Sequence, residues 1–161
     1  MTIVRDPVDL FESLWSYSSM SAYYHMDLEA FALAPKTGHL ATRAYRNLGR
    51  NQMLWDAGLP ASAMDNATAV RAKIDEMEDT FGLVMMAERF DESMVLLRDF
   101  LCWDFGDVVN FKLNARKEGK KQSLSPGARA ALREYLAADY RLYDHFKATF
   151  EARVDTFGLA R

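Results

Sequence analysis

Cysteine, histidine and long apolar runs are all scarce in this chain of 161 residues, and each scarcity excludes a class of protein. With one cysteine, Cys102, the chain cannot form an internal disulfide, and three scattered histidines do not complete a structural zinc set. No stretch reaches the roughly 20 apolar residues of a membrane span, and the first residues lack the pattern of a signal peptide. We therefore expect no metal ion and no membrane span in this chain.

The chain also lacks a strong excess of either positive or negative charge. The 20 Lys and Arg residues nearly balance the 23 Asp and Glu residues, which leaves a net charge of −3. The overall field is weak, so nucleic acid is not an expected partner, and only a local basic patch would bind one. A composition of 50% apolar and 12% aromatic residues excludes disorder and suits one globular domain over residues 1–161.

The chain contains two predicted strand-to-helix units. Residues 2–4 form a short strand, and Asp6-Pro7 starts a helix because Asp caps free N–H groups and Pro fits the first helical position. The apolar run 81–87 predicts a second strand covered on both faces, and Asp91 is expected to cap the helix after it. Further helices are predicted over residues 28–33 and 67–80, and from Ser125-Pro126 onward with a break near residues 138–139.

These units predict an α/β fold, helix-rich with a few parallel strands. A parallel sheet normally needs more than two strands, so the sheet is expected to be incomplete. The first strand also begins at the very start of the chain. We expect either that Met1 is an internal start or that this chain is the second part of a larger protein.

The segment from Arg5 to Ser13 is the strongest candidate for chemistry. Arg5 follows the first strand, at the usual ligand edge of an α/β sheet, and Ser13 lies about 9 Å along the next helix. A guanidinium and a hydroxyl placed in this way suit a single phosphate. The alternative is that Arg5 pairs with a nearby carboxylate and Ser13 is solvated, and the negative charges of Asp9 and Glu12 favour that alternative.

Other polar and aromatic residues are weaker candidates. Glu88 and Arg89 follow the second strand, where they contact a ligand or, more commonly, form an internal salt bridge. His145 is expected to be structural rather than catalytic, and Trp55 and Trp103 either stack on a sugar or belong to the core. A basic patch, which is a ligand contact or a solvated loop, comprises Lys112, Arg116, Lys117, Lys120 and Lys121.

In the segment from Arg5 to Ser13, and in several later blocks, the chain resembles the galactose-3-O-sulfotransferase family, which includes galactosylceramide sulfotransferase. Arg-Asp-Pro-Val with Ser at the eighth position after Arg is similar to the 3′-phosphate motif of sulfotransferases. Further matching blocks follow in the family's order over nearly the whole chain: Asn51-Gln-Met-Leu-Trp-Asp-Ala-Gly-Leu59, Ala87-Glu-Arg-Phe-Asp-Glu-Ser-Met-Val-Leu-Leu97, Leu101-Cys-Trp-Asp104, Phe111-Lys-Leu-Asn-Ala-Arg116 and Tyr143-Asp-His-Phe146.

The resemblance implies a partial P-loop-like sulfotransferase fold and an enzyme that uses 3′-phosphoadenylyl sulfate (PAPS) as its sulfate donor. The acceptor it implies is the 3-hydroxyl of galactose on a glycolipid or glycan. Carried over to this sequence, Arg5 and Ser13 hold the 3′-phosphate of the donor. Arg116 and Lys117 resemble the Arg-Lys-Gly segment that closes over the donor in many cytosolic sulfotransferases, although Glu118 interrupts that order here.

The chain departs from the family in what it lacks. Family members have an upstream membrane anchor and a Lys-Thr loop for the 5′-phosphosulfate, whereas the only Lys-Thr here, Lys36-Thr37, follows Pro35 without a glycine-rich loop. The catalytic base of related enzymes also lies upstream, so no catalytic residue is assigned. We expect an inactive isolated chain, soluble by itself, whose full enzyme is a lumenal Golgi membrane protein. The alternative is a non-catalytic helical interaction protein derived from the same fold.

Overall fold

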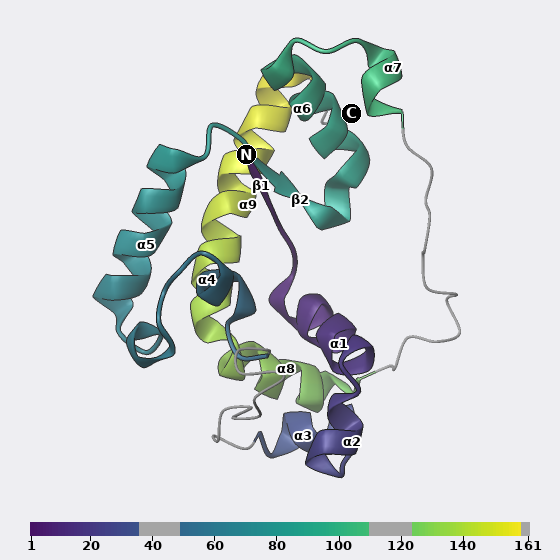
Figure 1. The fold of residues 1–161 in the computed structure, drawn as a ribbon, viewed down its shortest axis with the longest axis vertical. Helices are drawn as coiled ribbons and strands as arrows, with labels where there is room; N and C mark the ends of the chain where they lie inside the picture. The colour runs from purple at the N-terminus through teal and green to yellow at the C-terminus, as the bar shows by residue number, and fades with distance from the viewer. Residues whose placement is uncertain (36–48, 110–123, 159–161) are drawn as a thin grey trace.

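The computed structural model describes residues 1–35, 49–109 and 124–158. This part of the chain is rich in helices and contains a small sheet (Figure 1). The elements, in chain order, are β1 (Thr2–Val4), α1 (Pro7–Tyr17), α2 (Met20–Tyr24), α3 (Leu28–Leu33), α4 (Gln52–Asp56), η1 (Ala61–Ala63), α5 (Ala67–Thr80), β2 (Val84–Met86), η2 (Ala87–Arg89), α6 (Phe90–Leu101), α7 (Phe105–Val108), α8 (Pro126–Tyr135) and α9 (Ala137–Phe157).

The two strands pair in parallel, as the sequence predicted, with Thr2 opposite Val84 and Val4 opposite Met86. The second strand is shorter than the apolar run 81–87, because only residues 84–86 pair with β1. Both strands therefore end at the same edge of the sheet. One continues into α1 and the other into η2, so the start of α1 and residues 87–89 become neighbours.

Helix α1 buries its apolar stripe in a cluster of aromatic rings formed with α2, α3 and α8. Its residues Val8, Phe11 and Trp15 recur at helical spacing and are at most 2% exposed. The ring of Phe31 in α3 lies 5.7 Å from that of Phe11 and 4.9 Å from that of Trp15, measured between centroids. The opposite stripe, which includes Asp9, stays half-buried and polar.

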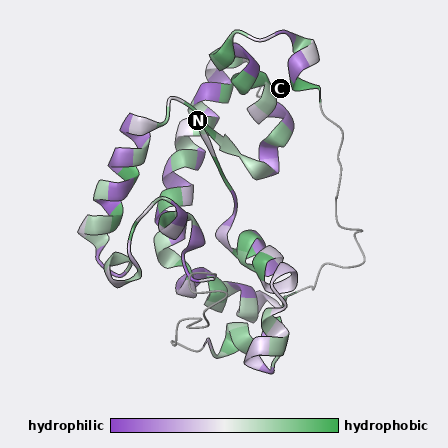
Figure 2. Cartoon of the chain, viewed as in Figure 1, coloured by the Kyte–Doolittle hydropathy of each residue, from purple (hydrophilic) through white to green (hydrophobic). Residues whose placement is uncertain are grey.

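Helix α9 connects the two ends of the molecule. Figure 1 shows it running from α8 past α4 and α5 to β2. Four of its apolar residues, Leu142, Phe146, Phe150 and Val154, are spaced by four and are buried along one face. Figure 2 shows hydrophilic and hydrophobic residues alternating along α5 and α9, the pattern of helices with one face in the core. The break between α8 and α9 falls at Leu136, slightly before the predicted position.

The prediction that Asp91 caps the helix after β2 is wrong. Helix α6 begins at Phe90, with Arg89 at the capping position, and Asp91 lies inside its first turn. The reason is that the chain passes from β2 through the short helix η2 directly into α6, without the extended residue that a side-chain cap requires. Asp91 still favours the helix, since a negative charge in the first turn interacts well with the helix dipole.

A buried serine forms hydrogen bonds with the last residue of β2. The hydroxyl of Ser93, which is fully buried, donates to the carbonyl of Met86 and accepts from its N–H group, both at 3.0 Å. Replacing Ser93 with Ala leaves both backbone groups without this partner, so we expect a loss of about 1–3 kcal/mol in the free energy of unfolding. Urea denaturation measures it. The matched control, Ser16→Ala on the exposed face of α1, should change stability by less than about 0.5 kcal/mol.

A search of the helices in the described ranges finds none that combines the length and the apolar character needed to span a membrane.

Candidate functional site

The candidate site lies where the two parallel strands end. Arg5 follows β1, and Glu88 belongs to η2, which follows β2. The backbone N–H of Asp6 donates to Oε1 of Glu88 at 2.5 Å, so the two strand ends are joined directly. In α/β folds this edge of the sheet is the usual position of a ligand site.

Arg5 is placed at this edge as a half-buried cation. Within residues 1–35, 49–109 and 124–158, its side chain has no hydrogen-bond or ion-pair partner. The alternative prediction was that Arg5 pairs with a nearby carboxylate, but the nearby carboxylates Asp6 and Asp9 interact with Arg129. A guanidinium that is partly removed from water and lacks a counter-ion is suited to binding an anion.

Asp6 organises the start of α1. Its Oδ1 accepts the N–H groups of Val8 at 3.0 Å and Asp9 at 3.1 Å, which confirms the predicted cap. The hydroxyl of Tyr140 in α9 donates to the same carboxylate, at 3.1 Å from Oδ2. Burial, together with the charge of Asp6, raises the pKa of Tyr140 to about 12, so this phenol keeps its proton. Because Asp6 occupies these N–H groups, an anion here would depend on side chains.

Arg129, in the first turn of α8, bridges Asp6, the N-cap of α1, and Asp9 in the first turn of that helix. Its Nη2 lies 2.9 Å from Oδ1 of Asp9 and 3.5 Å from Oδ1 of Asp6. The hydrogen bond to Asp9 is the main cause that raises the pKa of Arg129 above its usual value. Arg129 and Tyr140 lie 120 residues or more from their partners. No local pattern in the sequence indicated either residue.

The predicted site residues are only partly placed. Arg5 lies between β1 and α1, and Ser13 is half-buried two turns into α1. Arg116 and Lys117 lie outside the described residues, as do Lys112, Lys120 and Lys121 of the basic patch and the Lys36-Thr37 pair. The assignment of Arg5 and Ser13 to a phosphate therefore stays a prediction.

The interpretation of Arg89 as a member of an internal salt bridge is confirmed. Its guanidinium binds the carboxylate of Glu92, one turn along α6, with both contacts at 2.5 Å. This hydrogen bond raises the pKa of Arg89 and lowers that of Glu92. The guanidinium also lies over the ring of Phe150, 5.2 Å from its centroid. Arg89 thus ties the start of α6 to α9.

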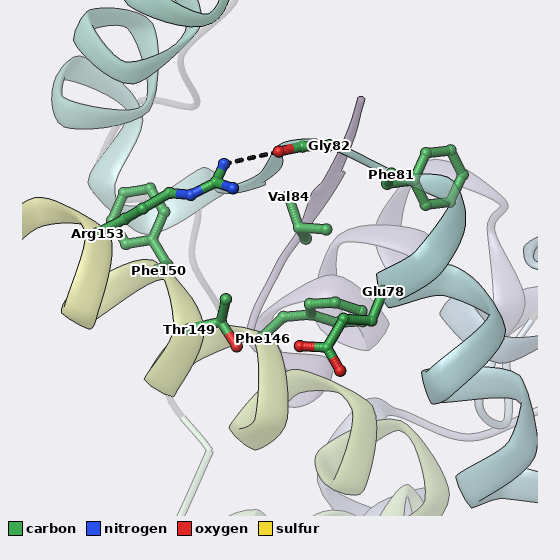
Figure 3. A pocket seen from close by; sticks show the side chains of 8 residues that line it. All are labelled: Glu78, Phe81, Gly82, Val84, Phe146, Thr149, Phe150 and Arg153. Atoms are coloured by element: carbon green, nitrogen blue, oxygen red, sulfur yellow. Dashed lines mark hydrogen bonds between the residues drawn. The ribbon is translucent and has the colours of Figure 1, made fainter.

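A cavity of about 160 Å³ lies near the other end of β2, beside Gly82 and Val84 (Figure 3). Its walls include Phe146 and Phe150, and Arg153 lies across it, donating to the carbonyl of Gly82 at 2.7 Å. Because it lies beside the amino end of β2, this cavity is at the opposite end of the strands from Arg5. We therefore do not assign it to the candidate site.

His145 and the tryptophans differ in their surroundings. Nε2 of His145 lies 3.2 Å from Oε2 of Glu78, and its ring stands edge-on to Phe146, contacts that fit a structural role. Trp55 packs partly buried against the core, whereas Trp103 is 43% exposed between α6 and α7. Of the two, only Trp103 is open enough to stack on a sugar. The described residues contain no group of side chains that could hold a metal ion.

Asp139 was missed by the sequence interpretation, although it is the most buried carboxylate among the described residues. It is 1% exposed, and its oxygens accept the N–H groups of Met53 and Leu54 in α4, each at 3.0 Å. Asn51 also forms a hydrogen bond with Asp139, because its Oδ1 accepts the backbone N–H of Asp139 at 3.1 Å. Burial outweighs these hydrogen bonds and raises the pKa of Asp139 to about 6. The contacts of Asp139 and Asn51 therefore link the start of α4 to α9.

Comparison with known proteins decides the family. The sequence model described as galactose-3-O-sulfotransferase matches residues 1–161. The chain belongs to the galactose-3-O-sulfotransferase family. The resemblance predicted from the Arg5 to Ser13 segment and the later blocks is therefore confirmed.

The curated relatives align with almost the whole of this chain. It is 41% identical to galactose-3-O-sulfotransferase 2 of Sus scrofa over 96% of its length, and 40% identical to galactose-3-O-sulfotransferase 3 of Homo sapiens over 99%. Galactosylceramide sulfotransferase of Mus musculus is 36% identical over 100% of the chain. The chain spans about two fifths of the length of these relatives, 39–40% of each. No solved structure matches it significantly.

Proposed function

We propose that this chain forms the 3′-phosphate half of the donor site of a sulfotransferase that transfers sulfate from PAPS to the 3-hydroxyl of galactose. The observation that supports this most is Arg5, a half-buried cation without a counter-ion among the described residues, at the edge where the two parallel strands end. The names of the relatives, galactose-3-O-sulfotransferase and galactosylceramide sulfotransferase, support a galactose-containing glycan or glycolipid as the acceptor.

Each proposed residue has a defined role at the phosphate. The guanidinium of Arg5 offers a planar pair of N–H donors that matches two phosphate oxygens. Ser13 adds a hydroxyl donor from the adjoining helix. Arg116 and Lys117 are proposed to close over the donor, by analogy with the Arg-Lys-Gly segment of many cytosolic sulfotransferases.

The proposal separates donor binding from transfer. Transfer of a sulfuryl group, like that of a phosphoryl group, depends on positioning and on groups that stabilise charge on the bridging oxygens. The family supplies these groups through a P-loop-like segment that the resemblance does not locate here. We therefore propose that the 161 residues alone bind nucleotide weakly and do not transfer sulfate. By the same resemblance, the full enzyme acts in the Golgi lumen.

Binding of 3′-phosphoadenosine 5′-phosphate (PAP), the product left when PAPS gives up its sulfate, tests the proposal. Titration of the purified chain in a calorimeter should give weak but saturable binding at one site. Circular dichroism before the titration establishes that the chain is folded. A folded chain that releases no heat with PAP up to millimolar concentrations would contradict the proposal and favour the non-catalytic interaction protein.

A further inference from the structure

A carboxylate lies between Arg5 and Ser13 along the chain. Arg5 precedes α1, and Asp9 lies in the first turn of α1, one helical turn before Ser13. At 1.5 Å per residue, Asp9 and Ser13 are separated by only about 6 Å along the helix. A phosphate that contacts both Arg5 and Ser13 therefore passes close to Asp9, and an uncompensated carboxylate there would repel it.

Arg129 compensates this charge from another element. Its Nη2 is 2.9 Å from Asp9 and 3.5 Å from Asp6, while its remaining nitrogens donate to no other residue in the described ranges. This edge carries the carboxylates of Asp6, Asp9 and Glu88, and Arg5 is one positive charge beside them. Arg129 adds a second positive charge, placed directly against Asp9.

We infer that Arg129 is a positioning residue of the anion site: by neutralising Asp9, it allows a phosphate monoester to bind between Arg5 and Ser13. This inference rests on the proposed function of the same site. It adds a residue from α8 that neither the Arg-Asp-Pro motif nor the comparisons indicate.

A purely structural role for Arg129 explains its geometry less well. Its side chain is 49% exposed, and that of Asp9 is 35% exposed. Ion pairs at this degree of exposure contribute little to the free energy of folding, because water and salt screen them. Asp6, the more buried partner, also has donors in Val8, Asp9 and Tyr140. The main effect of removing Arg129 is therefore on the charge that an approaching anion meets.

The test compares PAP binding by the wild-type chain with that of Arg129→Ala, Asp9→Asn and the double variant. Arg129→Ala should weaken binding roughly tenfold because Asp9 is then uncompensated. Asp9→Asn should strengthen it by roughly threefold, because Arg129 is released toward the anion. The double variant removes one charge of each sign and should return to within about threefold of wild type. Arg71→Ala, which removes an exposed arginine of α5, is the control and should bind as wild type does.

The outcomes separate this inference from the proposed function. If the wild-type chain binds PAP and Asp9→Asn binds it equally or more weakly, Arg129 does not act by neutralising Asp9, and the inference is overturned while the proposed function stands. If the folded wild-type chain does not bind PAP, the proposed function fails and the inference fails with it. Asp9→Asn keeps the Asp6 cap of α1, so it remains informative even if Arg129→Ala does not fold.

Discussion

Replacing Arg5 with Ala is expected to weaken the binding of PAP by about 10- to 100-fold, the range that loss of a charge-assisted hydrogen-bond pair produces. The phosphate then loses the guanidinium that faces it at the end of β1. Arg5→Lys keeps the charge but loses the two parallel donors, so it should bind with intermediate affinity. Arg71→Ala, on the exposed side of α5, is the matched control that removes one positive charge elsewhere.

The same variant should leave the fold intact. Because Arg5 has no side-chain partner in the described ranges, Arg5→Ala should change the free energy of unfolding by less than about 1 kcal/mol. Loss of binding together with unchanged stability would identify Arg5 as a ligand residue. Unchanged affinity in Arg5→Ala would show that PAP binds elsewhere and would remove Arg5 from the site.

Asp139→Ala should cause the largest loss of stability among the polar substitutions considered. The carboxylate accepts two N–H groups at the start of α4, and both become buried without an acceptor when it is removed. Each unsatisfied buried group costs about 1–3 kcal/mol, so we expect a total of about 2–6 kcal/mol. Urea denaturation of the variant and the wild type at neutral pH measures this difference.

Asp139 also predicts a dependence of stability on pH. Its pKa is raised to about 6 in the folded chain, while in the unfolded chain it is about 3.9. The folded state therefore holds an extra proton between these values. The part of the stability that is linked to this proton is fully present below about pH 4 and is lost as the pH rises through 6.

Asp139→Asn is the matched control for this effect, because its side chain does not titrate. Subtracting its free energy of unfolding from that of wild type, between pH 4 and 7, isolates the contribution of Asp139 from that of the other carboxylates. We expect the difference to fall as the pH rises. A constant difference would mean that burial does not shift the pKa of Asp139.

Local signals in the sequence predicted the elements whose causes are themselves local. Asp6-Pro7 and Ser125-Pro126 begin α1 and α8 through side-chain caps that contact N–H groups two or three residues away. The helices predicted over residues 28–33 and 67–80 are confirmed as α3 and α5, with the same bounds. The start of α6 was misplaced because η2 precedes it, and a short helix of this kind has no distinct signature in the sequence.

The contacts that organise the candidate site depend on distant parts of the chain. Asp6 and Asp9 acquire Arg129 and Tyr140 only when α8 and α9 pack beside α1, and Asp139 meets α4 across more than 80 residues. Periodicity and capping rules do not reach over such separations. They therefore indicated Arg5 and Ser13 as candidates but not the residues that compensate the charge around them.

The most direct test of the central claim compares two nucleotides that differ in which ribose oxygen carries the phosphate. If the chain holds the 3′-phosphate half of the donor site, adenosine 3′-monophosphate should bind about as well as PAP, and adenosine 5′-monophosphate at least about tenfold more weakly. Calorimetry with all three ligands on the wild-type chain provides the comparison. Equal binding of the 3′- and 5′-monophosphates, or a preference for the 5′-monophosphate, would contradict the account.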